Sequence, residues 1–387
     1  MNLNVYAPEA EIILRTARPR LLPHQDERIS VLIKQTDLDW DRLVALAVRH
    51  RTVPQLYGHL RRICLADIPP APLQELRSAS LRFTERSLRQ ASDLLRIVRL
   101  LADAGIETIA YKGPVMAALA YSGQVRSCND LDLLMRREDR DRAVKLLLSH
   151  GFRQYHSLSE AAQQARVKYG HEEILCADGD RLYLEIHYEI APIRYNLGLA
   201  TDDLFARSIS QPFSGTSIAT LSHEDLLLYL CWHGCKHFWQ PVRQIVDIVE
   251  FVAAVPNMDW TALGLRSRRL DLHGAVTVAL ILCRDVLGTD LPPEAMAQFT
   301  ETRAARAASA FFRRGLFADR PPTVPLRRLE EIRTQVTLRS GLSNKIATAA
   351  ALAFTPSERD VEGAAVNPRL SRPIRLLRKY LTRGASS

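Results

Sequence analysis

A pair of aspartates inside a short apolar segment constrains this chain more than any other feature. Asp130 and Asp132 stand two residues apart in the run 129–135, whose last residues are leucines and a methionine. On a β-strand, side chains two residues apart project from the same face. Two carboxylates held this close repel each other, so the arrangement is most stable when a divalent cation lies between them. Hard oxygen ligands suit Mg²⁺ or Mn²⁺, so the run predicts a metal site on a strand. The alternative, which the pair alone leaves open, is a solvent-exposed strand at the edge of a sheet.

The segment before this pair is predicted to form a strand, a glycine turn and a helix. Residues 107–111 have strand character, residues 114–120 have helical character, and Lys112 and Gly113 join them. Glycine permits close approach of a backbone, Pro114 suits the first position of a helix, and free N–H groups at a helix start attract phosphate oxygens. Lys112 adds a mobile positive charge. The segment therefore predicts a phosphate-binding turn, although a Lys-Gly dipeptide alone is more often an ordinary turn.

Residues 181–190 are predicted to form a strand with a polar face. Glu185 and His187 lie on that face, and Asp178-Gly179 ahead of the strand is typical of a hairpin turn. Glu185 is therefore a candidate third carboxylate beside the aspartate pair. The alternative is that this face is the solvent-exposed side of an antiparallel strand.

Arg126 stands just before the aspartate strand, in the segment 123–127. Its planar guanidinium can pair with a phosphate. The alternative is an internal ion pair that orients the loop, and the residues alone leave both open.

In this order along the chain, these residues resemble the nucleotidyltransferase superfamily typified by DNA polymerase β. The chain is more similar to the bacterial group described as uncharacterised nucleotidyltransferases, whose members share a Lys-Gly turn, an Arg, an Asp-x-Asp and a later acid-x-His strand. The similarity extends to residues 39–57, 222–248 and 373–380. It departs from the superfamily at Gly113-Pro114, which replaces Gly-Gly or Gly-Ser and so removes one N–H and one hydroxyl from the phosphate cradle. It departs again where the third acid is a glutamate.

The resemblance implies three catalytic carboxylates that also hold Mg²⁺ or Mn²⁺: Asp130, Asp132 and Glu185. It implies four nucleotide-binding residues: Lys112, Gly113, Arg126 and His187. The implied reaction transfers a nucleoside monophosphate from an NTP, with ATP expected, to a hydroxyl acceptor and releases pyrophosphate. A small molecule or sugar is favoured as the acceptor, and nucleic acid is disfavoured because no basic strip rich in aromatic residues is evident. The alternative is a non-catalytic nucleotide-binding regulatory or scaffold protein with the same fold, which the Pro114 departure favours.

The expected fold is α+β (mixed α/β), a nucleotidyltransferase core with a small mixed sheet flanked by helices, plus helical regions at both ends. We predict four parts: a helical N-terminal region at 1–100, the α/β core at 101–220, a C-terminal helical domain at 221–320, and a helical extension with a basic amphipathic tail at 321–387.

The net charge and the cysteines indicate the kind of ligand and the cellular location to expect. A net charge of +9 suits a polyanionic ligand such as a nucleotide, a nucleic acid or an anionic membrane surface. The six cysteines are scattered, which favours reduced thiols in a cytoplasm. The N-terminus lacks a signal pattern, and no run approaches the roughly 18 apolar residues of a membrane span. We expect a cytoplasmic protein, with the basic tail 373–383 either peripheral to the inner membrane or docked on its own core.

The segment 231–237 places cysteines and histidines at alternate positions. On a helix, Cys231 and Cys235 share one face while His233 and His237 share another, so the four cannot converge on one tetrahedral zinc ion. We expect the two histidines either to line the nucleotide cleft or to pack in a core or interface. Asp247 is expected to bond to one of them or to the nucleotide.

Overall fold

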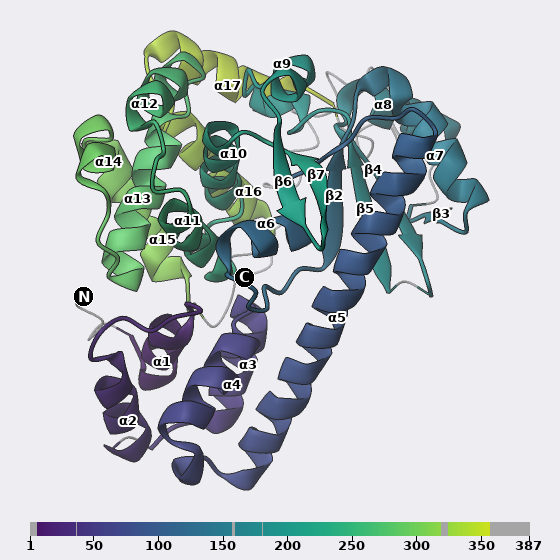
Figure 1. Ribbon diagram of the computed structural model, residues 1–387. Coiled ribbons are helices and arrows are strands. Elements are labelled where there is room, and N and C mark those ends of the chain that lie inside the picture. The colour runs from purple at the N-terminus through teal and green to yellow at the C-terminus, as the bar shows by residue number, and fades with distance from the viewer. Residues whose placement is uncertain (1–5, 36, 157–158, 180, 319–323, 357–387) are drawn as a thin grey trace, which may run out of the picture.

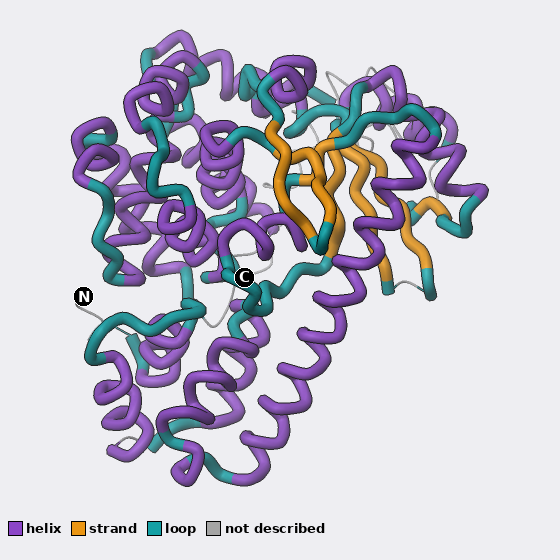
Figure 2. Tube along the Cα trace, viewed as in Figure 1, coloured by secondary structure: helices purple, strands orange, loops and turns teal. Residues whose placement is uncertain are grey.

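The structure is a computed structural model that describes residues 6–356, apart from 36, 157–158, 180 and 319–323 (Figure 1). It is mostly helical, with a five-stranded mixed sheet and a separate two-stranded ribbon (Figure 2). The predicted α+β class, with a small mixed sheet flanked by helices, is confirmed. The basic tail 373–383 lies outside the described residues, and the four-part division stays a prediction.

The residues before the sheet are helical, as predicted. The helices are α1 (Pro8–Thr16), α2 (Gln25–Gln35), α3 (Trp40–His50), α4 (Val53–Ile63) and α5 (Pro70–Asp103), with a 3₁₀ turn η1 (Leu65–Asp67) before α5. Asp39 caps α3 because its side chain accepts the N–H of Arg42. The first half of α5 packs with the shorter helices, and its second half packs on the sheet (Figure 1). The long helix therefore joins the N-terminal helices to the sheet.

The five-stranded sheet has the order β1-β2-β5-β4-β3. Its strands are β1 (Ile109–Ala110), β2 (Asp130–Leu134), β3 (Arg153–Gln154), β4 (Glu172–Ala177) and β5 (Leu182–His187). Only β2 and β5 pair in parallel, and the other neighbours in this sheet are antiparallel. The predicted hairpin joins β4 to β5 through Asp178 and Gly179, which both have the positive φ (53° and 60°) that a tight hairpin turn requires.

Two strands are shorter than predicted. The strand expected at 107–111 is reduced to β1, because Lys112 already caps the following helix. The strand expected at 181–190 ends at His187, a few residues before Pro192, which has no N–H to donate to a ladder. A ribbon of β6 (Ile209–Phe213) and β7 (Thr216–Thr220) was not predicted. Pro212 lies inside β6, where proline is unusual except on an edge strand.

Helices connect and flank the strands. They are α6 (Gly113–Ala120), α7 (Arg140–Ser149), α8 (Glu160–Tyr169) and α9 (Thr201–Ala206), with 3₁₀ turns η2 (Arg137–Asp139) and η3 (Ile193–Tyr195). The polar segment 153–170 contains β3 and α8. The apolar residues of α5 and α7 share one core with the sheet.

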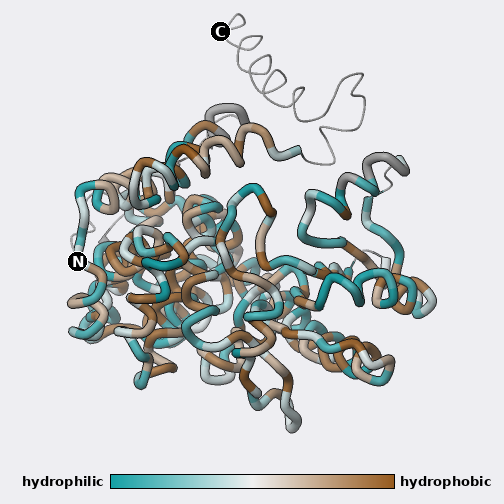
Figure 3. The backbone as a smooth tube through the Cα atoms, turned by 90° about the horizontal axis from the view of Figure 1, so that it is seen from above, coloured by the Kyte–Doolittle hydropathy of each residue, from teal (hydrophilic) through white to brown (hydrophobic). Residues whose placement is uncertain are grey.

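The C-terminal part is helical, as predicted. Its described helices are α10 (His223–Lys236), α11 (Arg243–Ala254), α12 (Trp260–Arg269), α13 (His273–Leu287), α14 (Pro293–Gln298), α15 (Arg303–Gly315), α16 (Val324–Thr337) and α17 (Leu342–Phe354). Ser222 caps α10 by accepting the N–H of Asp225 at 3.2 Å. Apolar and polar residues alternate along many helices in Figure 3, as expected when one face of each packs inward. No helix within the described ranges is long and apolar enough to span a membrane.

The largest core joins these helices to α6 and to the edge of the sheet. It contains the buried rings of Tyr111, Trp232 and Phe251, which come from the end of β1, from α10 and from α11. This packing brings the C-terminal helices against the turn that follows β1.

Candidate active site

A cavity of about 310 Å³ lies where the sheet meets the C-terminal helices. Its walls come from the β1–α6 turn, from β2 and β5, from the start of β4, and from α10, α11 and the turn between them. All seven site residues predicted from the sequence line it: Lys112, Gly113, Arg126, Asp130, Asp132, Glu185 and His187. The fold thus brings together side chains that are up to 75 residues apart in the chain. The order of the motifs alone did not show that they are close in space.

The parallel pairing of β2 and β5 brings the acidic residues together. Asp132 stands directly beside Glu185 in the register, and His187 follows two residues later on the same face. Ligand atoms of these three residues all lie within 4.8 Å of one another. The Nε2 atom of His187 is 3.2 Å from Oδ1 of Asp132 and 3.4 Å from Oε2 of Glu185. Asp130 lines the same cavity but is not a member of this close group.

The two carboxylates of the group differ in proton affinity. Burial alone would raise the pKa of Asp132, but the charges of Lys112 and His187 beside it outweigh burial and hold its pKa at about 2. Burial raises the pKa of Glu185. The hydrogen bond from His187 lowers this pKa and repulsion from Asp132 raises it, and the net shift is upward. The carboxylates of Asp132 and Glu185 outweigh burial at His187 and raise its pKa to about 9. Asp132 is therefore the firmly ionised acid, and Glu185 is the acid that takes up a proton more readily.

Lys112 and Gly113 form the turn at the edge of the cavity. The Lys112 ammonium makes an ion pair with Oδ1 of Asp132. Gly113 has a φ of +53°, and a Cβ there would lie 3.4 Å from the backbone oxygen of Asp130. A larger residue would be strained in that conformation. Glycine thus lets the start of α6 lie directly against β2.

Arg126 forms the internal ion pair that was one of its two predicted alternatives. Its Nε and Nη2 atoms donate to the two oxygens of Asp247, each at 2.8 Å, and both side chains are almost fully buried. Its Nη1 atom donates to the carbonyl of Gly113 at 3.2 Å. Tyr121 and Arg243 complete the shell around Asp247, at 2.6 Å and 3.2 Å. Asp247 was expected to bond either to His233 or His237 or to the nucleotide. Its two oxygens accept from the two arginines and the tyrosine instead, and the nucleotide alternative stays a prediction.

The cysteines and histidines of residues 231–237 lie on different faces of α10, as their helical spacing predicted. Cys231 and Cys235 are buried in the apolar core. His233 and His237 line the cavity, and their ring centroids are 4.4 Å apart. Lining the cavity was one of the two alternatives predicted for these histidines, and the structure shows that one.

Arg51 is a cavity residue that was not predicted from the sequence. It ends α3 in a left-handed conformation (φ 60°), and its side chain lines the cavity. Burial lowers the pKa of Arg51 to about 10, helped by repulsion from Arg243 and opposed by Asp130. Within the described part of the chain, its guanidinium has no hydrogen bond or ion pair. The Arg49-His50-Arg51 run at the predicted end of a helix was the available signal, but nothing in the sequence placed it near the aspartates.

His171 and Glu172 were also missed. They stand at the start of β4, and Glu172 pairs with His187 in the register of the hairpin. Counting residues back from the turn at Asp178-Gly179 would have paired Glu172 with His187, because a hairpin turn fixes the register of its two strands.

Comparison with known proteins agrees with the geometry. The family described as "Uncharacterised nucleotidyltransferase" matches residues 36–288 of this chain. No curated protein matches it.

Two solved structures are similar over part of the chain. A crystal structure of ANT(2″)-Ia in complex with adenylyl-2″-tobramycin is 15% identical, covering 47% of this chain and 97% of that one, with a TM-score of 0.33. A solution structure of the antibiotic-resistance factor ANT(2″)-Ia is 14% identical, covering 46% and 90%, with a TM-score of 0.33. The family match alone covers well over half of the chain, so the chain belongs to the uncharacterised nucleotidyltransferase family and is a transferase enzyme.

Proposed function

We propose that this enzyme is a Mg²⁺-dependent nucleotidyltransferase that transfers the nucleoside monophosphate of an NTP, ATP first, to a hydroxyl group of a small molecule or sugar. One observation carries the proposal. Asp132 and Glu185, from adjacent parallel strands, face the same cavity as the Gly113 turn. Carboxylates beside a turn that presents backbone amides are the arrangement that binds a metal-complexed triphosphate.

The residues fit a hard divalent cation. Asp130, Asp132 and Glu185 offer carboxylate oxygens, and Oδ2 of Asp132 is buried without a hydrogen-bond partner. A buried acceptor oxygen without a partner is costly unless a cation or donor occupies the place. When bound, Mg²⁺ would neutralise triphosphate charge and lower the pKa of the acceptor hydroxyl.

The basic residues divide into two roles. Lys112 and Arg51 line the cavity and in our proposal neutralise the phosphate oxygens, while the Gly113 turn contributes backbone amides. Arg126 also lines the cavity, but Asp247 and Gly113 already engage it. We therefore assign Arg126 to nucleotide binding as a positioning residue, which holds the Gly113 turn in place.

Glu185 is the residue that we assign to the acceptor proton. Its side chain is 23% exposed, and burial with the nearby Asp132 charge raises its pKa. The acceptor oxygen attacks the α-phosphorus, the bond to the β-phosphate oxygen breaks, and pyrophosphate leaves. The hydroxyl proton passes to Glu185. His187 keeps this carboxylate and Asp132 in place through its Nε2 atom.

The size of the cavity supports a small acceptor. A volume of about 310 Å³ falls at the lower end of the range for small-ligand sites. Its aromatic members Tyr229 and Trp232 are core residues of α10 and form no exposed platform for stacked bases. These features support a small molecule or sugar over a nucleic acid.

Labelling with α-³²P NTPs tests the proposal. The purified enzyme is incubated with each labelled NTP, Mg²⁺ and a cell extract, and labelled products are identified by mass spectrometry. We expect transfer that disappears in Asp130→Ala and Asp132→Ala. Asp103→Ala, at the exposed end of α5, is the matched control and retains transfer. Nucleotide binding without any transfer would instead establish the regulatory or scaffold alternative.

A further inference from the structure

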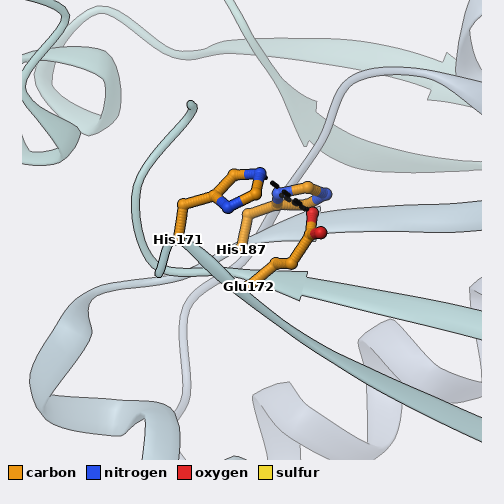
Figure 4. Close-up of side chains that lie close together, drawn as sticks. All are labelled: His171, Glu172 and His187. Atoms are coloured by element: carbon orange, nitrogen blue, oxygen red, sulfur yellow. Dashed lines mark ion pairs between the residues drawn. The ribbon is translucent and has the colours of Figure 1, made fainter. Parts of the chain in front are cut away.

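A second group of metal-ligand side chains lies in the wall of the same cavity and shares His187 with the first group. Figure 4 shows His171, Glu172 and His187 converging from the start of β4 and the end of β5. One ligand atom from each lies within 4.8 Å of the others. Oε2 of Glu172 is 3.1 Å from Nε2 of His171 and 3.4 Å from Nδ1 of His187. The three donor atoms therefore surround one small volume.

The hairpin holds these side chains in place. Glu172 and His187 are direct partners in the β4–β5 register. The carbonyl of His171 accepts the N–H of Tyr188 at 2.9 Å. Gly170 before it lies so close to Arg166 that a Cβ would be 2.4 Å from the Arg166 backbone oxygen. The backbone on both sides of the group is thus fixed by its own contacts, as a preorganised ligand set requires.

The two nitrogens of His187 face different sites. Nε2 faces the carboxylates of Asp132 and Glu185. Nδ1 is buried without a hydrogen-bond partner, in a residue only 2% exposed, and it faces Glu172. A histidine that ligates a metal through one nitrogen commonly donates its other N–H to a carboxylate. In His187, Nδ1 would be the metal ligand, and Nε2 would donate its N–H to the carboxylate of Asp132.

We propose that His171, Glu172 and His187 bind a transition-metal ion of the zinc class, separate from the Mg²⁺ of the proposed nucleotidyl transfer. Two imidazoles and one carboxylate suit Zn²⁺, whereas Mg²⁺ prefers oxygen ligands alone. Three protein ligands leave a fourth position for water or substrate, as in catalytic zinc sites. That position would face the cavity, because His171 and Glu172 line it.

The ion has a positioning role in this proposal. The His187 ring separates the two sites, so zinc is not one of the paired ions about 3.5–4 Å apart that act together in two-metal catalysis. Instead it fixes His187 and, through Nε2, the carboxylate of Asp132. The inference goes beyond the proposed function and does not require it.

The ammonium group of Lys236 would compete with a metal ion for the carboxylate of Glu172. It lines the same cavity, and its charge and that of Glu172 attract each other. Removing the ammonium in Lys236→Met is therefore expected to strengthen zinc binding, a result that a merely structural cluster would not give.

Zinc retention tests the proposal. The full-length protein is stripped with a chelator, dialysed against ZnCl₂ with excess Mg²⁺ to fill the oxygen site, and analysed for bound metal. We expect one zinc per chain, lost in His171→Ala and Glu172→Gln and retained in Asp130→Asn. Asp132→Asn, which removes the carboxylate behind His187, should weaken binding by roughly 10- to 100-fold. His233→Ala, which lines the same cavity outside the group, is the matched control and retains the zinc.

Cobalt gives an independent readout. Co²⁺ in place of zinc should show the intense visible bands of a low-coordinate site, and these should vanish in His171→Ala. His171→Gln serves as a second variant if the alanine variant unfolds. Absence of stoichiometric zinc in the wild type, or its retention in a folded His171 variant, would overturn the proposal. Zinc retained by an enzyme that transfers no nucleotide would count against the proposed function alone.

Discussion

Arg126 and Asp247 face each other through two hydrogen bonds of 2.8 Å, although they are 121 residues apart in the chain. Arg126 also donates to the carbonyl of Gly113, and Asp247 belongs to α11. One buried ion pair therefore ties the turn at the edge of the cavity to the C-terminal helices. Removing one member leaves an uncompensated charge on an almost fully buried side chain.

Asp247→Asn should destabilise the protein by roughly 3–5 kcal/mol, because Arg126 and Arg243 would both lose their counter-charge. Urea denaturation measures this loss. Glu85→Gln, which breaks the exposed pair of Glu85 with Arg89, should cost less than about 1 kcal/mol. The double variant Arg126→Met/Asp247→Leu should recover part of the stability, since Arg243 still lacks its partner, but not the activity. Full activity in the double variant would show that the pair does not position the Gly113 turn.

Arg51→Met should weaken NTP binding by roughly ten- to hundredfold, because a charge-assisted bond to phosphate would be lost. Isothermal titration with a non-hydrolysable NTP measures the affinity. Arg61→Met, on the exposed face of α4, is the control and should bind as the wild type does. Unchanged affinity in Arg51→Met would remove this residue from the proposed triphosphate site.

Gly234→Ala should destabilise the protein by about 1–3 kcal/mol, because its Cβ would lie 2.6 Å from the ring of the buried Trp239. The displaced ring would also move His237 and Gln240, which line the cavity. Gly58→Ala is a matched control inside α4, where a Cβ meets nothing within 4 Å, and should stabilise by about 0.5–1 kcal/mol. Thermal unfolding of both variants checks the difference, and equal shifts would contradict the packing.

His50 should make the fold sensitive to acid. Burial, with repulsion from Arg49, lowers its pKa from 6.5 to about 3, and its Nδ1 accepts the N–H of Val242 at 3.2 Å. Below pH 6.5 the unfolded chain takes up a proton that the folded chain refuses, so stability falls as the pH falls. Between pH 8 and pH 5 the loss from this group is about 2 kcal/mol. Urea denaturation of His50→Asn, which keeps an acceptor for Val242, should show a loss smaller by that amount. An unchanged pH dependence would contradict a neutral buried His50.

Much of the fold and of the candidate site could be predicted from local sequence patterns. Alternation placed Asp130 and Asp132 on one strand, and the Asp178-Gly179 turn placed Glu185 and His187 on another. These patterns are local, and the parallel pairing that brings the two strands together is not. The family resemblance implied that the three acids meet at one site, but the parallel pairing of β2 with β5 came only from the structure.

The parts that were missed depend on distant contacts. Arg51 lines the cavity where its neighbour His50 accepts the N–H of Val242, just before α11. Asp247 meets Arg126 where α11 packs on α6. The role of Arg126 was undecided for the same reason, since its partner is 121 residues away. No periodicity or turn signal encodes such pairings, because they result from tertiary packing.

The chemical class of the reaction is tested most directly by comparing two positions of the radiolabel. The enzyme is given the same NTP labelled either at the α-phosphate or at the γ-phosphate, with Mg²⁺ and its acceptor mixture, beside Asp132→Ala as the inactive control. Nucleotidyl transfer predicts that the α label enters the acceptor while the γ label is recovered as pyrophosphate. Recovery of the γ label in the acceptor, or α-label transfer undiminished in Asp132→Ala, would contradict the account.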